Sequence, residues 1–134
     1  AGKAINITKT TGAHALSYFF TEKYNIPHGH SVALFLPSFF TYNYKVDNNN
    51  CIDKRGPIFV KKKINEISNL LGISSPELVE LELQNFLIKI GINTNLDALN
   101  INRNIYVKSL DMANLERMKN NPRFFLKENF IQFL

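Results

Sequence analysis

Apolar residues recur every three or four positions along most of the chain, which is the spacing of one face of an α-helix. The first such segment starts near Thr8 or Thr11 and runs to Tyr24, with Gly12 weakening its start. It should end before Pro27, because the residue that precedes a proline is driven towards extended backbone. The side chains expected to face inward are Ala13, Leu16, Phe20 and Tyr24.

A second helix is expected to begin near His28 and to continue through Phe39. Pro37 should kink it, because proline has no N–H to donate to the preceding turn. Residues 44–57 are then polar, rich in Asn and closed by Gly56-Pro57, which is typical of a loop. This loop separates a part that carries histidines from a part with a purely structural pattern.

Two further helices have clear boundary signals. Gly72 should end the first of them in a left-handed conformation. Ser75, Pro76 and Glu77 then supply a cap, a first helical residue and an acid in the first turn of the second. The residues expected to face the core are Val60, Ile64, Ile67 and Leu71, followed by Val79, Leu83, Phe86, Leu87 and Ile90.

The last third of the chain continues the helical pattern. Residues 93–104 form a loop or a short helix, and a helix from Tyr106 to Met118 should end at Asn120-Asn121-Pro122. A final helix is expected over residues 125–134, and the inward residues between these breaks are Leu110, Leu115 and Met118. No segment alternates as a strand would, so we expect an all-α bundle of about six helices that forms one domain over residues 1–134.

The composition supports a packed core in a chain of 134 residues, because 45% of them are hydrophobic and 11 are Phe. The single cysteine, Cys51, excludes an intrachain disulfide and fits a reducing compartment, so we expect a cytoplasmic protein. Cys51 has no His or Cys near it in the sequence, and we interpret it as a spare loop thiol. No apolar run reaches the roughly 18 residues needed to span a membrane, so we expect no membrane contact.

The net charge of +5 raises the possibility of nucleic-acid binding. The basic residues are scattered, however, and the densest run, Lys61 to Lys63, opens a helical pattern in which it should form a solvated face. We therefore expect no nucleic-acid partner.

Two histidines stand where a helical hairpin could bring them together. His14 lies on the first helix and His28 opens the second, and imidazole is a common ligand of divalent transition metals. His30 is two residues from His28, so it should point to another side of the helix. Two histidines do not complete a four-ligand site, and a histidine on a helix is more often simply packed or exposed. The pair is therefore a candidate half of a metal site.

A resemblance to a known family becomes specific at these residues. Residues 10–18, read as Thr-Thr-Gly-Ala-His-Ala-Leu-Ser-Tyr, and residues 26–37, which contain Pro-His-Gly-His and Leu-Pro, resemble the metal-binding region of the iron-containing alcohol dehydrogenases. Residues 114–123 also resemble the C-terminal end of that family. The middle of the chain matches in its helical pattern only.

The resemblance implies an N-terminal nucleotide-binding α/β domain followed by a C-terminal all-helical domain, with a divalent metal in the cleft between them. In this family one Asp and three His hold iron or, in some members, zinc; His14 and His28 match two of those histidines. The other ligands and the loops that bind NAD or NADP would lie upstream of this chain. Tyr18 stands where many members have a further His, so it is a possible catalytic hydrogen-bond donor.

We therefore interpret the chain as the C-terminal part of an NAD(P)-dependent, metal-dependent alcohol dehydrogenase or aldehyde reductase, inactive alone and acting in an intact, homo-oligomeric enzyme on a small alcohol or aldehyde. The histidine segments are similar to those of family members placed near phosphonate metabolism. Two other classes stay open. One is a non-catalytic helical interaction or oligomerisation domain, and a distant second is a basic nucleic-acid binder.

Overall fold

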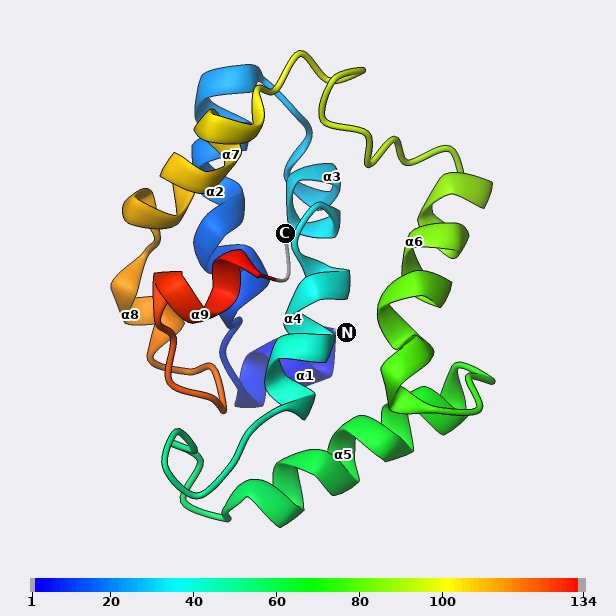
Figure 1. The fold of residues 1–134 in the computed structure, drawn as a ribbon, viewed down its shortest axis with the longest axis vertical. Helices are drawn as coiled ribbons and strands as arrows, with labels where there is room; N and C mark the ends of the chain where they lie inside the picture. The colour runs from blue at the N-terminus through cyan, green and yellow to red at the C-terminus, as the bar shows by residue number, and fades with distance from the viewer. Residues whose placement is uncertain (1, 133–134) are drawn as a thin grey trace.

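The computed structural model describes residues 2–132, and every regular element in this part of the chain is helical (Figure 1). The all-α prediction is confirmed, although the helices are shorter and more numerous than expected. The α-helices are α1 Gly2–Ile7, α2 Gly12–Tyr24, α3 His28–Ala33, α4 Leu36–Tyr44, α5 Pro57–Leu70, α6 Val79–Lys89, α7 Arg103–Ser109, α8 Leu115–Met118 and α9 Lys127–Ile131. Two 3₁₀ turns, η1 Pro76–Leu78 and η2 Leu110–Met112, precede α6 and follow α7.

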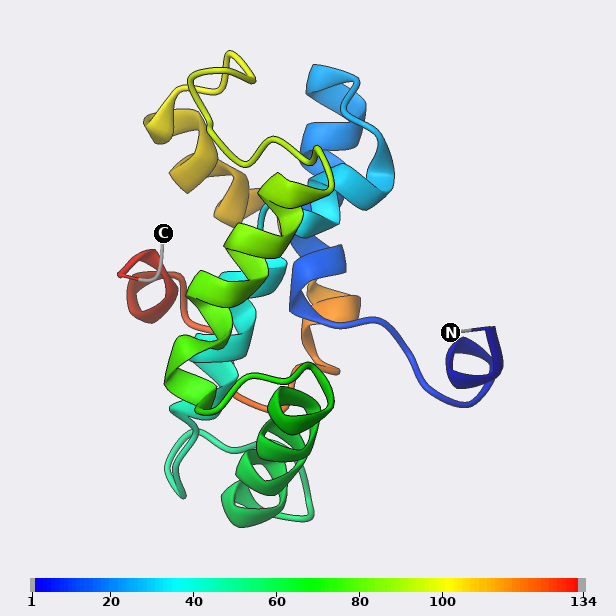
Figure 2. The same ribbon diagram turned by 90° about the vertical axis from the view of Figure 1, so that its right-hand side faces the viewer.

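The helices form an up-and-down arrangement around one main core. In Figure 1 the chain rises through α2, descends through α3 and α4, crosses the base as α5 and rises again as α6. A long connection then passes over the top to α7, and α8 and α9 complete the side next to α2. Helix α1 stands away from this body in Figure 2, and it has no buried residue.

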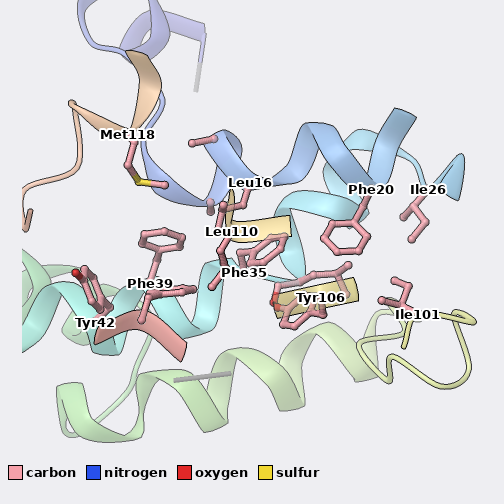
Figure 3. Close-up of a cluster of buried hydrophobic side chains, with 14 residues drawn as sticks. Leu16, Phe20, Ile26, Phe35, Phe39, Tyr42, Ile101, Tyr106, Leu110 and Met118 are labelled. Atoms are coloured by element: carbon pink, nitrogen blue, oxygen red, sulfur yellow. The ribbon is translucent and has the colours of Figure 1, made fainter. Parts of the chain in front are cut away.

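Aromatic side chains fill the centre of the main core (Figure 3). Phe20, Phe35 and Tyr106 meet there, and the rings of Phe35 and Tyr106 stack with their centroids 4.9 Å apart. Such a pair contributes about 0.5–1.5 kcal/mol beyond the area that it buries. The hydroxyl of Tyr106 donates to the carbonyl of Leu34 at 2.8 Å, and burial raises the pKa of this phenol far above its usual range. The phenol therefore joins α7 to the α3–α4 turn as a neutral donor.

The predicted kink at Pro37 was wrong, because the helix breaks completely before the proline. Helix α3 ends at Ala33, a turn follows at Leu34 and Phe35, and α4 begins at Leu36. Pro37 therefore lies in the first turn of α4, where its missing N–H has no intrahelical partner to lose. The break lets Phe35 turn into the core, where it is fully buried.

The predicted helix from Tyr106 to Met118 was also wrong, because it is interrupted at Asn114. The N–H of Asn114 leaves the helical pattern and donates to the carbonyl of Ala15 on α2 at 3.0 Å. The side chain of Asn114 then caps α8 by accepting from the backbone N–H of Arg117. The restart turns Leu115 outward, where it is 71% exposed instead of facing the core.

The last helix is shorter than the predicted residues 125–134. It runs from Lys127 to Ile131, and residues 133–134 lie outside the described part of the chain. No side chain caps its start, and Lys127 instead forms an ion pair with Asp111 at 2.6 Å. The final segment is therefore tied to the η2 turn by charge.

Helices α5 and α6 begin and end nearly as predicted, but fewer of their apolar side chains are buried than expected. Gly72 adopts the expected left-handed backbone with φ 73°, and Val60 and Ile64 are buried. The hydroxyl of Ser75 bonds to the carboxylate of Glu77 and caps no backbone N–H. Because α6 packs mainly on α4 and η1, only a narrow side of it faces the core. Four of the predicted inward residues are exposed: Ile67, Leu71, Phe86 and Ile90.

The loop after α4 is closed by the C-terminal segment. Cys51 forms an isolated antiparallel bridge with Arg123, and its thiol lies 3.5 Å from the carbonyl oxygen of Asp53. Lys61 to Lys63 are exposed, as expected of a solvated face. Within residues 2–132 no helix combines the length and the apolar character needed to cross a membrane.

Gly12 offers a test of the packing at the start of α2. A Cβ added there would lie 2.0 Å from a ring carbon of Phe39, which is itself buried in the core. We expect Gly12→Ala to lower the free energy of unfolding by about 1–3 kcal/mol, because the Phe39 ring must move. Urea unfolding followed by circular dichroism measures this change.

Gly29 provides the matched control, since it is also helical and no atom lies within 4 Å of the Cβ it would gain. Gly29→Ala should leave stability unchanged or raise it by up to about 1 kcal/mol. Equal unfolding midpoints for the two variants would contradict the close approach of α2 to Phe39.

Candidate metal centre

The two histidines are positioned by a tight connection between α2 and α3. Helix α2 ends at Tyr24 and is capped by Asn25, whose φ of 53° lies in the left-handed region that Asn tolerates better than most residues. Pro27 then has extended backbone, with φ −50° and ψ 137°, and α3 begins at His28. As the sequence predicted, one imidazole lies within a helix and the other opens the next helix.

Small hydroxyl side chains let α2 and α3 pack closely. Ser17 and Ser31 are both fully buried in this contact. The hydroxyl of Thr21 lies 3.2 Å from the oxygen of Ser31 and 3.2 Å from the carbonyl oxygen of Ser17. Ser31 in turn donates to the carbonyl of Ile26 in the connecting turn. The orientation of α3 on α2 is therefore fixed by hydrogen bonds as well as by packing.

This contact brings the rings of His14 and His28 together. Their centroids are 5.4 Å apart and their planes are inclined at 64°. His14 is half-buried, whereas His28 is exposed, so the pair faces outward from the domain. No group of three or more His, Cys, Asp or Glu side chains that could hold a metal occurs among residues 2–132. The pair is thus an open, two-donor arrangement.

Ser17 favours one tautomer of His28. Its hydroxyl donates to the carbonyl of His14 at 3.0 Å, and its oxygen lies 3.5 Å from Nδ1 of His28. A hydroxyl has one proton, which is already donated, so this oxygen can only accept from an Nδ1–H. With the proton on Nδ1, the lone pair of His28 is on Nε2 and is free to coordinate a metal ion.

The surroundings also favour neutral imidazole at His14. Its pKa is lowered first by burial, then by the positive charge that His28 carries when protonated, and then by Arg117. Neutral imidazole is the form that binds a metal ion. The donor chemistry of the pair therefore fits a divalent transition metal as half of its ligand set.

Tyr18 and Arg117 lie beside the histidines. The ring of Tyr18 stacks on His28 with a centroid distance of 5.3 Å and an angle of 28°. The guanidinium carbon of Arg117 lies 5.2 Å from the centroid of Tyr18, and its Nη1 donates to the hydroxyl of Thr10 at 2.5 Å. The sequence pointed to Tyr18 but not to Arg117, which is separated from Thr10 by 107 positions along the chain.

The third histidine is directed elsewhere. Nε2 of His30 lies 2.5 Å from the carbonyl oxygen of Asn93, in the connection between α6 and α7. His30 therefore contacts a distant loop, while His14 and His28 contact each other.

The phenylalanines near the pair are mainly core residues. Phe20, Phe35 and Phe39 are buried, and Phe19 is partly buried against the same core. Phe39 also lines, together with Thr11 and Ala13, a hollow between α2, α4 and α5.

A buried polar cluster fixes the segment that follows Arg117. The side-chain amides of Asn43 and Asn121 donate to each other's carbonyl oxygens at 3.1 and 2.8 Å. Nη1 of Arg123 donates to the carbonyl of Tyr42, and its guanidinium carbon lies 4.1 Å from the centre of the Tyr42 ring. The hydroxyl of Tyr42 donates to the carbonyl of Phe124 at 2.7 Å. The Asn-Pro-Arg sequence therefore anchors the C-terminal segment on α4.

The all-helical fold and the histidine pair of the α2–α3 hairpin agree with one family of proteins. Residues 1–134 match, over the whole chain, the profile described as Fe-containing alcohol dehydrogenase family, C-terminal. The chain belongs to this family. It is 28% identical over 134 residues to the phosphonoacetaldehyde reductase of Streptomyces viridochromogenes. That alignment covers 100% of the chain and 33% of the relative, so the chain spans about a third of the relative's length.

The amide pair offers a test of the C-terminal anchor. Asn121→Ala removes both hydrogen bonds to Asn43 and a third to the carbonyl of Arg123, all in a side chain that is 1% exposed. We expect a loss of about 1–3 kcal/mol in the free energy of unfolding, because the amide of Asn43 is left without its partner.

The neighbouring Asn120 is the control, since it is exposed and its two hydrogen bonds are long, at 3.5 Å. Asn120→Ala should change stability by about 0.5 kcal/mol or less. Thermal unfolding of the two variants measures these changes in stability. If Asn120→Ala lost as much stability as Asn121→Ala, the proposed anchoring role of the Asn43–Asn121 pair would be contradicted.

Proposed function

We propose that residues 1–134 are the helical domain of a metal-dependent, NAD- or NADP-dependent alcohol dehydrogenase or aldehyde reductase, and that His14 and His28 are two of its metal ligands. The convergence of the two rings across the α2–α3 contact, with centroids 5.4 Å apart, carries this proposal. Membership of the iron-containing alcohol dehydrogenase family supports it.

The properties of the pair suit Fe²⁺ or Zn²⁺, both of which accept imidazole nitrogen. The surroundings of His14 lower its pKa, which favours the neutral form, and Ser17 leaves Nε2 of His28 free. No group of three candidate ligands occurs among residues 2–132, and we propose that other parts of the intact enzyme supply the remaining ligands. We accordingly expect turnover only in the intact enzyme, and we expect that enzyme to be homo-oligomeric.

A bound metal would supply Lewis acidity towards the oxygen of a small alcohol or aldehyde, and the nicotinamide would exchange the hydride. The residues of this chain contribute orientation. His14 and His28 would hold the metal, and Ser17 would keep the ring of His28 in the required tautomer. Tyr18 lies against His28, from where its hydroxyl can donate a hydrogen bond to the substrate oxygen.

The name of the Streptomyces relative suggests a substrate class. That relative is described as a phosphonoacetaldehyde reductase and aligns with the full length of this chain. We propose a short aldehyde of this kind, with phosphonoacetaldehyde as the first compound to assay.

The histidine assignment is tested in the full-length enzyme. His14→Ala and His28→Ala should each lose bound metal and more than about 99% of turnover, because removing a ligand leaves the ion weakly held. Metal content by atomic emission, activity and circular dichroism are measured together. His30→Ala is the matched control and should keep its metal, because that ring contacts Asn93. Retained metal and turnover in the His14→Ala enzyme would refute the assignment.

The role of Tyr18 is tested by Tyr18→Phe, which keeps the ring on His28 and removes only the hydroxyl. We expect kcat/KM to fall about tenfold, the effect of one lost hydrogen bond in the transition state, with metal content unchanged. Tyr24→Phe on the same helix serves as the control. An unchanged kcat/KM for Tyr18→Phe would show that its ring alone matters.

A non-catalytic interaction domain is the second candidate, and the apolar surface of α6 favours it. Phe86, Ile88 and Ile90 are all more than half exposed. Phe86 and Ile90 are four positions apart and so lie on the same side of this segment, where exposed apolar side chains can contact another chain or domain. The His14→Ala variant separates the two functions. If the domain served only for interaction, this substitution would change neither the metal content nor the turnover of the full-length enzyme.

A further inference from the structure

Arg117 is held in place next to the histidine pair by contacts of its own backbone. It lies in α8, whose start is capped by the side chain of Asn114. The backbone N–H of Asn114 donates to the carbonyl of Ala15, which directly follows His14 on α2. The short helix that carries Arg117 is thereby fixed to the helix that carries His14.

The side chain of Arg117 extends over the site. It is half-buried, donates to Thr10 and lies over the ring of Tyr18, which stacks on His28. Tyr18 therefore contacts both the guanidinium of Arg117 and the ring of His28.

The positive charge of Arg117 has no carboxylate partner among the described residues. The ion pairs within residues 2–132 involve other cations, and the neighbouring acid Glu116 is paired with Lys119 at 3.2 Å. The side-chain hydrogen bond of Arg117 goes to the neutral hydroxyl of Thr10 and uses one of the five N–H donors of the guanidinium. Donors are therefore left for a further acceptor.

Arg117 places a fixed positive charge with unused donors next to the histidine pair, and such a group favours an anion as its partner. The planar fork of arginine matches the two oxygens of a carboxylate or of a phosphonate or phosphate group. Stacking on Tyr18 alone is a weak interaction at a partly exposed site. Binding of an oxyanion therefore explains the position of Arg117 and its unused donors better than stacking on Tyr18 does.

We propose that Arg117 binds an anionic group at the far end of the substrate, so that the enzyme selects short aldehydes that end in a phosphonate, phosphate or carboxylate. The inference rests on the proposed function, since it uses the His14–His28 pair as the place where the aldehyde oxygen is held. Tyr18 contacts both His28 and Arg117, so the two groups proposed to hold the ends of the substrate are neighbours of the same ring.

The experiment compares two aldehydes of similar length in the full-length enzyme, namely phosphonoacetaldehyde and the neutral propanal. Arg117→Gln should lower kcat/KM for phosphonoacetaldehyde about 10- to 100-fold, the worth of a charged hydrogen bond, mostly through a higher KM. It should leave kcat/KM for propanal within about twofold. Arg117→Lys should recover part of the loss, because it keeps the charge without the fork.

Lys119→Gln is the matched control, since it removes one positive charge from an exposed side chain two residues further on. Lys119→Gln should leave kcat/KM unchanged for both aldehydes. An equal loss on both aldehydes, or no loss on either, in the Arg117→Gln enzyme would overturn the proposal and leave Arg117 as a structural contact to Tyr18.

A binding measurement separates this inference from the proposed function. Methylphosphonate, inorganic phosphate and acetate are titrated into the enzyme by calorimetry, without turnover. Binding that is lost in Arg117→Gln and kept in Lys119→Gln supports the anion site, and the tightest of the three probes identifies the preferred group. No binding to the unmodified enzyme overturns the inference, while the metal content of His14→Ala independently decides the proposed function.

Discussion

The site depends on the close packing of α2 against α3. The hydroxyls of Ser17, Thr21 and Ser31 lie in this contact, and the two serines are fully buried where larger side chains would hold the helices apart. The same contact sets the distance between the rings of His14 and His28. It also places Ser17 where its oxygen faces one nitrogen of His28. The packing of α2 on α3 therefore also sets the orientation of the His14 and His28 rings.

The remaining helices support this hairpin from two sides. The aromatic core of Phe35 and Tyr106 holds the α3–α4 turn in place, and the hydroxyl of Tyr106 satisfies the carbonyl of Leu34 exposed by that turn. On the other side, the bond from Asn114 to Ala15 fixes α8 to α2. This attachment also sets the position of Arg117, which lies in α8.

Features encoded by neighbouring residues could be predicted from the sequence. Pro27 ended α2, Gly72 ended α5, and the spacing of His14 and His28 indicated a hairpin that joins them. Features that depend on distant contacts could not be predicted. The break at Asn114 follows from a bond to α2, and the exposure of Phe86 follows from the few elements packed on α6. Arg117 gave no local signal because its neighbours in space, Thr10 and Tyr18, lie at the other end of the chain.

The long sequence separation between α2 and α8 has a consequence for how the site assembles. The α2–α3 hairpin joins residues close in sequence, so it can form early and with a small loss of chain entropy. The contact of Arg117 with Thr10 spans 107 positions, and that of Asn121 with Asn43 spans 78. During synthesis the imidazole pair can therefore be complete while the C-terminal segment is still on the ribosome. The contact of Arg117 with Thr10 can form only after residue 117 has been synthesised, so the two proposed metal ligands can meet before the proposed anion-binding residue joins them.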